Sequence, residues 1–295
     1  MHIRTGVAVL SLPVALISAL LILGHVDAQR TDQRDIAVDD PRPVAKAIEI
    51  LVGGHRDVIV TYEDPPYAYS GDIRDVTNEV RKDLDRYESG KAPKVLIPRG
   101  GALTASYSVA SDSGVPADWG DTVQRLVNAQ LLTESGGRFR VQRDASAIHV
   151  IPTQIRNATG EWTPVQSVLD APISLQKEGN GVELLDAITE AIGKVTGQRV
   201  LVGTIPVSLF MHYHGVLNAS GSARDALLQL FESTGAKMSW NLLYGPDLKA
   251  YALNINVVAL PHAQPQIPPQ SIAHDPAGVS PAGPTARRAA QPANN

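Results

Sequence analysis

Cysteine is absent from the 295-residue chain, and this absence excludes several kinds of site at once. Without thiols there can be no disulfide framework, no thiolate zinc site and no cysteine nucleophile. A folded form of this chain must therefore be held together by its hydrophobic core.

An excess of charge of one sign is also lacking. The chain carries 26 Lys and Arg residues against 30 Asp and Glu residues, which gives a net charge of −4. A protein that follows the phosphates of a nucleic acid needs basic residues in excess on one face. The balance argues against a nucleic-acid partner.

The common catalytic signatures are missing as well. The sequence contains no GxSxG, HExxH or Walker phosphate loop, and "GNGVEL" lacks the third glycine of a dinucleotide site. We therefore assign no catalytic residue and no cofactor, and we expect a protein without enzymatic activity.

The first 28 residues have the pattern of a secretory signal peptide. Arg4 precedes an apolar run, and Val26-Asp27-Ala28 forms a small-x-small cleavage site. The apolar run is about 20 residues long, which is enough to span a bilayer, so a retained membrane anchor is the alternative. We expect cleavage after Ala28 and an exported protein that is periplasmic or secreted and associated with the cell envelope.

The opposite end of the chain is rich in proline and alanine. Residues 261–295 hold eight of the 21 prolines and have almost no apolar periodicity. Such a segment cannot bury enough apolar surface to offset the entropy of ordering, so we expect a disordered tail.

Four segments between these ends share one pattern, in which a capped amphipathic helix ends at glycine and a strand follows. The expected caps are Asp40, Asp118, Asn180 and Ser222. Helix–strand followed by helix–hairpin occurs twice. The sequence therefore predicts an α+β fold of two tandem small modules, each with two helices packed on a small mixed sheet.

The boundaries of these parts follow from the pattern. We expect a signal peptide at 1–28, a linker at 29–37, a first module at 38–155 with an insert at about 70–94, a linker at 156–169, a second module at 170–260 and the tail at 261–295. The charged insert fits either a short amphipathic helix or a mobile loop.

The second module carries a recognisable pattern. In "GVLNASGSARDALLQLFESTGAKMSWNLL", a strand ends in small polar residues, a helix with Leu-rich turns follows, and Thr-Gly precedes the next strand. Over residues 172–258 this pattern resembles the short N-terminal domain shared by secretins and TonB-dependent receptors. Those domains bind other proteins in the periplasm, so the resemblance implies an interaction module.

Aromatic residues make up only 5% of the chain, yet three tyrosines gather in "TYEDPPYAYS" at 61–70. Tyrosine and tryptophan dominate the hot spots of protein interfaces. We predict a patch that binds a protein of the cell envelope and contains Tyr62, Tyr67, Tyr69 and Trp162. Strand edges beside "VIVTYE" and "HYHGVLNA" would offer a second means of contact, by pairing with a partner strand.

The same stretch also contains carboxylates. Glu63 and Asp64 are adjacent, so on an extended chain they point to opposite faces and cannot act on one atom. The Pro-Pro pair favours a turn in which both carboxylates are solvated. The alternative is a glycosidase that pairs Asp64 with Asp72 or Asp75 and stacks Tyr67 on a sugar.

A metal site is the remaining alternative. "MHYHG" places His212 and His214 on one face of a predicted strand, and His149 is the candidate for a third ligand. Two imidazoles on a polar edge strand account for the same residues, so we predict no metal.

These observations favour an exported, non-catalytic interaction or scaffold protein. The alternative is a carbohydrate-active or metal-assisted hydrolase. Contact with a membrane is expected only if the signal segment is retained as an anchor.

Overall fold

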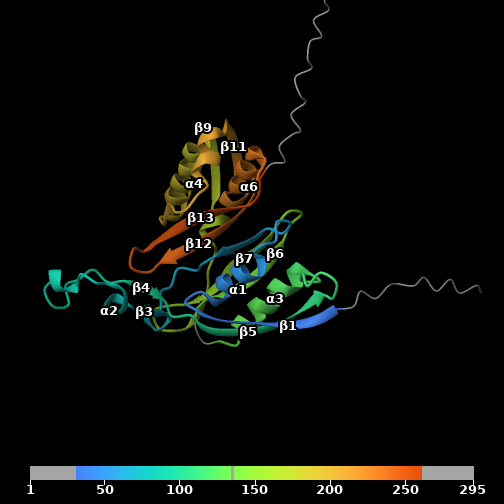
Figure 1. The fold of residues 1–295 in the computed structure, drawn as a ribbon. Helices are drawn as coiled ribbons and strands as arrows, with labels where there is room; N and C mark the ends of the chain where they lie inside the picture. Colours follow the sequence, from blue (N-terminus) through green and yellow to red (C-terminus); the bar gives the residue numbers. More distant parts are fainter. Residues whose placement is uncertain (1–30, 134–135, 261–295) are drawn as a thin grey trace, which may run out of the picture. The chain divides into compact units, whose positions relative to one another are not determined.

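The computed structural model describes residues 31–133 and 136–260, which belong to one compact unit (Figure 1). The predicted signal peptide at 1–28, residues 29–30 of the linker predicted at 29–37 and the predicted tail at 261–295 lie outside the described residues. The linker prediction is wrong for residues 31–37, because they belong to a ten-residue strand, Thr31–Asp40. The fold is mixed α+β. No helix among the described residues is both long enough and apolar enough to cross a membrane.

Four of the helices lie in the four segments where the sequence pattern places them, whereas the helix at Val207–His212 includes His212, which the sequence predicted to lie on a strand. They are α1 (Pro43–Val52), α2 (Thr77–Val80), α3 (Trp119–Gln130), α4 (Gly181–Thr196), α5 (Val207–His212) and α6 (Ala223–Thr234). As predicted, Asp118, Asn180 and Ser222 accept backbone hydrogen bonds at the starts of α3, α4 and α6. Asp40 does not cap α1, because its side chain instead accepts from the backbone N–H of Arg42.

The strands form one large sheet and three two-stranded ribbons. They are β1 (Thr31–Asp40), β2 (Val60–Glu63), β3 (Ile73–Asp75), β4 (Leu96–Pro98), β5 (Gly101–Ala110), β6 (Arg138–Arg143), β7 (Ile148–Arg156), β8 (Trp162–Pro164), β9 (Pro172–Asn180), β10 (Arg199–Val202), β11 (His214–Ser222), β12 (Lys237–Gly245) and β13 (Ala250–Ala259). The large sheet has seven strands in the order β10-β13-β12-β2-β7-β6, with β8 also paired to β7. The ribbons are β1–β5, β9–β11 and β3–β4.

The large sheet contains strands from both halves of the chain. β12 pairs in parallel with β2, so that Asn241 lies beside Tyr62 and Leu242 beside Glu63. The sequence predicted a separate small sheet for each half. The structure differs because β2, which is buried along its whole length, needs a strand on either side to satisfy its backbone groups.

The two pairs of long helices cover opposite faces of this sheet. Tyr62 belongs to the core formed with α1 and α3, whereas Leu242 belongs to the core formed with α4 and α6. Successive residues of a strand point to opposite faces, so neighbouring positions on β2 and β12 serve different cores. Figure 1 shows α4 and α6 lying between the β9–β11 ribbon and the β12–β13 hairpin.

The segments expected to be a linker and an insert are both structured. Residues 156–169 include β8, and Leu169 in the short 3₁₀ turn Val168–Asp170 is fully buried in the core of α4 and α6. The insert consists of 3₁₀ turns at Ser70–Asp72 and Leu84–Arg86, the β3–β4 ribbon and the single-turn α2. It is therefore neither one amphipathic helix nor a bare loop.

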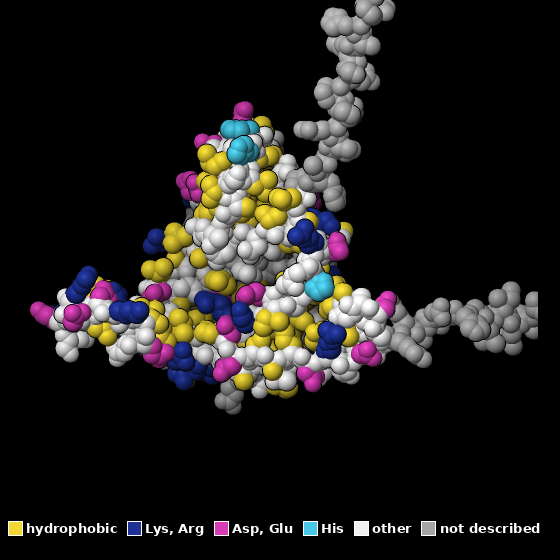
Figure 2. Space-filling model, in the orientation of Figure 1, with side chains coloured by type: hydrophobic (Ala, Val, Ile, Leu, Met, Phe, Trp, Pro, Cys, Tyr) yellow, Lys and Arg dark blue, Asp and Glu magenta, His cyan; other side chains and the backbone are white. Residues whose placement is uncertain are grey.

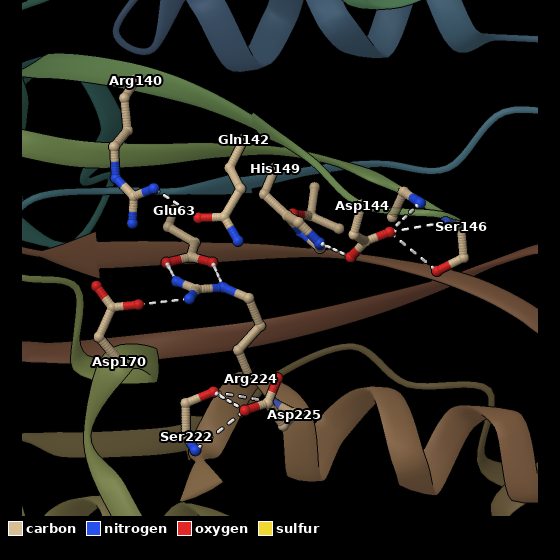
Figure 3. A network of polar contacts seen from close by, with 12 residues as sticks. Glu63, Arg140, Gln142, Asp144, Ser146, His149, Asp170, Ser222, Arg224 and Asp225 are labelled. Carbon is tan, nitrogen blue, oxygen red and sulfur yellow. Dashed lines mark hydrogen bonds and ion pairs between the residues drawn. The ribbon is translucent and has the colours of Figure 1, made fainter.

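A buried ion pair joins the two halves across the sheet. Arg224 on α6 donates from Nε and Nη2 to the two carboxylate oxygens of Glu63 at 3.0 and 2.8 Å (Figure 3). Its Nη1 also donates to Asp170. Burial alone would lower the pKa of Arg224, but the charge of Glu63 and the hydrogen bonds to both carboxylates outweigh burial and raise it.

We expect Arg224→Met to lower the free energy of unfolding by about 3–5 kcal/mol, because it leaves the Glu63 carboxylate buried without a partner. Urea denaturation followed by circular dichroism measures the change. The double variant Glu63→Leu/Arg224→Met should recover part of the loss, since no unpaired charge then remains beneath α6.

The matched control is Lys194→Met, which breaks the exposed Glu190–Lys194 pair on α4. Its effect should stay below about 1 kcal/mol. Similar losses in Arg224→Met and Lys194→Met would show that the buried pair does not join the halves in the way described.

Candidate functional site

Two of the predicted partner-binding tyrosines lie inside the protein. Tyr62 is 2% exposed and Tyr67 is 9% exposed. Both donate their hydroxyl groups to Oδ1 of Asp64, at 2.8 and 3.2 Å respectively. A buried carboxylate needs donors, and these two tyrosines supply them. Tyr62 and Tyr67 are therefore unavailable to a partner, which corrects the predicted patch.

Asp64 connects three elements rather than facing solvent. Its other oxygen, Oδ2, accepts from Nε of Arg42 at 2.5 Å and from the backbone N–H of Tyr244 at 3.0 Å. Arg42 also donates to the carbonyl of Tyr244 at 2.7 Å. Burial and the charge of Asp64 raise the pKa of Tyr62 and Tyr67 well above the usual range, so both hydroxyl groups stay protonated as donors. The prediction of solvated carboxylates at Glu63 and Asp64 is thus wrong, because each is buried beside an arginine.

Asp72 is held in a similar way. It is 1% exposed and forms an ion pair with Arg156, whose Nε donates to Oδ2 at 3.1 Å. The backbone N–H of Gly136 also donates to Asp72, at 3.3 Å. The two carboxylates that a glycosidase would need, Asp64 and Asp72, are therefore both occupied by arginines.

The other two aromatic residues of the predicted patch do come together. The guanidinium of Arg156 lies 4.7 Å from the ring centre of Tyr69 and 5.9 Å from that of Trp162. The guanidinium of Arg138 also lies over Trp162, 4.3 Å from its ring centre. Tyr69 and Trp162 are half-buried, so cation–π contacts with the protein's own arginines already use much of their ring surface.

The structure does not place the three candidate histidines as the sequence predicted. His212 is the last residue of α5 and His214 is the first residue of β11, so the prediction that they share one face of a strand is wrong. Nδ1 of His212 lies 2.7 Å from the carbonyl oxygen of Ser208, to which it donates. His149 lies inside the large sheet, and no group of three potential ligands occurs among the described residues.

His149 instead takes part in a buried network that the sequence analysis did not find. Its Nδ1 lies 2.8 Å from Thr61 Oγ1, and its Nε2 lies 2.8 Å from Asp144 Oδ2 (Figure 3). The order hydroxyl–imidazole–carboxylate is also that of a hydrolase triad. Thr61 and His149 are both fully buried, however, and His149 stacks on Trp240 with ring centres 5.3 Å apart. No substrate reaches this hydroxyl, so the network is structural.

Asp144 holds the turn that precedes β7. Its Oδ1 accepts from the backbone N–H groups of Ser146 and Ala147, both at 2.7 Å. Burial opposes ionisation, but the hydrogen bonds from His149 and from these two backbone groups outweigh it and lower the pKa of Asp144 to about 2.

A group whose pKa is lower in the folded state contributes stability above its unfolded pKa, here 3.8, and loses this contribution as the pH falls toward 2. We expect Asp144→Asn to remove about 1 kcal/mol of stability at pH 7, a value reduced because the side chain is about one-third exposed. The variant should also lose less stability than the unchanged protein between pH 4 and pH 2. Urea denaturation at several pH values measures both effects, with Asp186→Asn as the control; equal pH slopes would contradict the assignment.

The edges of the large sheet differ from those predicted to be free. The edge of β2, in "VIVTYE", is covered by β12. β11, in "HYHGVLNA", pairs with β9 on one side and has no strand partner on its other side among the described residues. Among the described residues, β10 pairs only with β13 and β6 pairs only with β7. The strands that present unpaired backbone groups at the ends of the large sheet are therefore β10 and β6.

These two edges have different chemistry. β6, with the sequence RFRVQR, carries Arg138, Arg140 and Arg143. Charged side chains on an edge strand discourage pairing with another chain. β10 has the sequence RVLV, in which Arg199 is followed by three apolar residues. β10 is thus the edge without this protection.

Exposed apolar side chains occur on β10 and on α5, which follows β10 in the chain. Leu201 is 39% exposed, Val207 is 56% exposed and Met211 is 50% exposed. A groove of about 540 Å³ lies along α5 beside the end of β13. Its lining comprises Pro206, Val207, Ser208, Leu209, His212, Val257 and Leu260. We call β10, α5 and this groove the β10–α5 surface.

A second groove, of about 660 Å³, lies between α1 and the β12–β13 hairpin. The hairpin contributes Ser239, Asn241 and Asn256, and α1 contributes apolar side chains such as Ile48. Glu49, His55 and Arg56 also line this groove, together with Thr204 and Asn254. No set of three metal ligands occurs here or elsewhere among the described residues. Figure 2 shows basic and acidic side chains mixed over the visible face, in agreement with the small net charge.

Comparisons of the chain with protein-family models, with curated proteins and with solved structures find no match.

Proposed function

We propose that this chain is an exported, non-catalytic interaction or scaffold protein of the cell envelope, composed of two tandem α+β modules. It binds another polypeptide at the β10–α5 surface. Export rests on the signal pattern at residues 1–28, and an interaction role in the periplasm rests on the resemblance of residues 172–258 to the short N-terminal domain.

The order of elements supports tandem modules. The first half contains strand, helix and strand (β1-α1-β2), then strand, helix and hairpin (β5-α3-β6-β7). The second half contains β9-α4-β10 and then β11-α6-β12-β13. The hairpins even share an irregularity, which falls between Arg138 and Phe139 in one and between Lys237 and Met238 in the other. Such a correspondence is expected of an internal repeat.

The observation that carries the interaction role is the unpaired, apolar edge at β10. An extended segment of a partner can add to this edge as a further strand, so that backbone hydrogen bonds provide affinity. The exposed side chains of α5 would then contact the partner's apolar side chains. The chain itself contains a junction of this kind, because β12 of one half adds to β2 of the other.

We expect Leu201→Lys to weaken partner binding at least about tenfold, because a charge on an edge strand disfavours the addition of another strand. A photo-crosslinking amino acid at Met211 would report binding in living cells. Adducts should form in the otherwise unchanged protein and should be largely lost when Leu201→Lys is added.

The matched control is Leu248→Lys, which changes an exposed leucine in the β12–β13 turn. Adducts should persist in this background. Adducts that survive Leu201→Lys, or a purified protein that captures no polypeptide but hydrolyses a glycan, would refute the proposed function.

A further inference from the structure

We propose that the β10–α5 surface binds a second copy of this chain, which gives a two-fold symmetric dimer in which two β10 strands pair antiparallel about Leu201. This inference rests on the proposed function, because it names the partner of the same surface. The backbone, the side chains and the flanking helices of β10 each support it.

On the side away from β13, the backbone groups of β10 pair with no other strand among the described residues, and they form a self-complementary set. The N–H of Gly203 donates to the carbonyl of Leu253 on β13 at 2.9 Å. Because backbone groups alternate in direction along a strand, Leu201 also faces β13, while the groups of Val200 and Val202 point to the open side. In an antiparallel pair, Val200 of each copy lies opposite Val202 of the other. The backbone N–H and C=O groups of these residues then form about four hydrogen bonds between the copies.

The side chains fit the same register. Leu201 lies opposite Leu201 of the second copy, in a pair without hydrogen bonds, where side chains approach most closely. This contact would bury two leucines that are 39% exposed in the single chain. Arg199 lies opposite Gly203 of the second copy, so the register brings no like charges together.

A side chain at position 203 would disturb the contact with β13. A Cβ atom there would collide with the side chain of Asn254 on β13. The packing against β13 therefore keeps the position facing Arg199 free of a side chain, and the guanidinium can extend past the strand.

The flanks of β10 account for further exposed apolar residues. In an antiparallel pair, the exit of one strand faces the entry of the other. The exit of β10 leads to α5, with Val207 and Met211 exposed, and its entry follows Val195 at the end of α4, which is 51% exposed. The two-fold arrangement brings these apolar groups from the two copies toward each other.

β6, at the opposite end of the large sheet, is a poor partner for β10. β6 carries three arginines, Arg138, Arg140 and Arg143, and β10 offers no acidic residue to neutralise them. Pairing β10 with β6 of a second copy would also add the positive charge of Arg199 to this group. At the junction between β12 and β2 within the chain, by contrast, opposite charges meet in the Glu63–Arg224 ion pair. The charges thus favour pairing of β10 with β10.

A cysteine at position 201 tests the register, since the chain has no other thiol. Under mild oxidation, Leu201→Cys should form a disulfide-linked homodimer, because residues in such a pair lie close enough for this bond. Leu248→Cys, in the exposed turn, should remain largely monomeric under the same conditions.

Sedimentation velocity over a range of protein concentrations tests the dimer without a covalent link. The unchanged protein should show a reversible monomer–dimer equilibrium, Leu201→Lys should raise its Kd at least about tenfold, and Leu248→Lys should leave it unchanged. Circular dichroism verifies that each variant is folded.

A protein that is monomeric at every concentration, with equal crosslinking of Leu201→Cys and Leu248→Cys, would overturn the dimer. A dimer that is unaffected by Leu201→Lys would also overturn it. The proposed function is judged separately: adducts at Met211 with a different protein, lost upon Leu201→Lys, would support that function even for a monomeric chain.

Discussion

The pairing of β12 with β2, held by the ion pair between Glu63 and Arg224, is the interaction on which the structure depends. It joins residues 161 positions apart in the sequence, in a place where neither charged group contacts solvent appreciably. Two charges out of water are costly, and their mutual attraction compensates only when geometry and hydrogen bonds are good. Here the guanidinium makes two hydrogen bonds to Glu63 and a third interaction with Asp170, so the pair fixes which strand meets β2 and in which register.

A second arginine–carboxylate set strengthens the same junction. Asp64 follows Glu63 directly and connects Arg42, before α1, to the backbone of Tyr244 on β12. The stretch "TYEDPPYAYS" is therefore the internal connection between the halves of the protein. Tyr62, Tyr67 and both carboxylates are occupied in this connection, whereas β10 lies at the end of the large sheet and pairs only with β13 among the described residues.

The local elements were predictable from the sequence because local rules govern them. A cap identified the start of α3, caps and terminal glycines identified α4 and α6, and alternation identified β6 and β13. The sharing of one sheet was not predictable, because no local signal tells that Asn241 will lie beside Tyr62. The tyrosines were misplaced for a related reason: a tyrosine that donates to a buried Asp64 has the same local sequence as one on the surface. The sequence did contain a signal for an unprotected edge at β10, because "RVLV" carries fewer charges than "RFRVQR" in β6. The position of β10 at the edge depends on the strand order, which the sequence does not show.

The placement of helices on opposite faces gives β2 an unusual constraint. Alternate residues of this one strand belong to different cores, with Tyr62 toward α1 and α3 and Glu63 toward α6. A slip of β2 by one residue would send an aromatic ring to the arginine of α6 and a carboxylate into an apolar core. An insertion or a deletion between Val60 and Glu63 would therefore disrupt both cores at once, so this short strand sets the register of both halves.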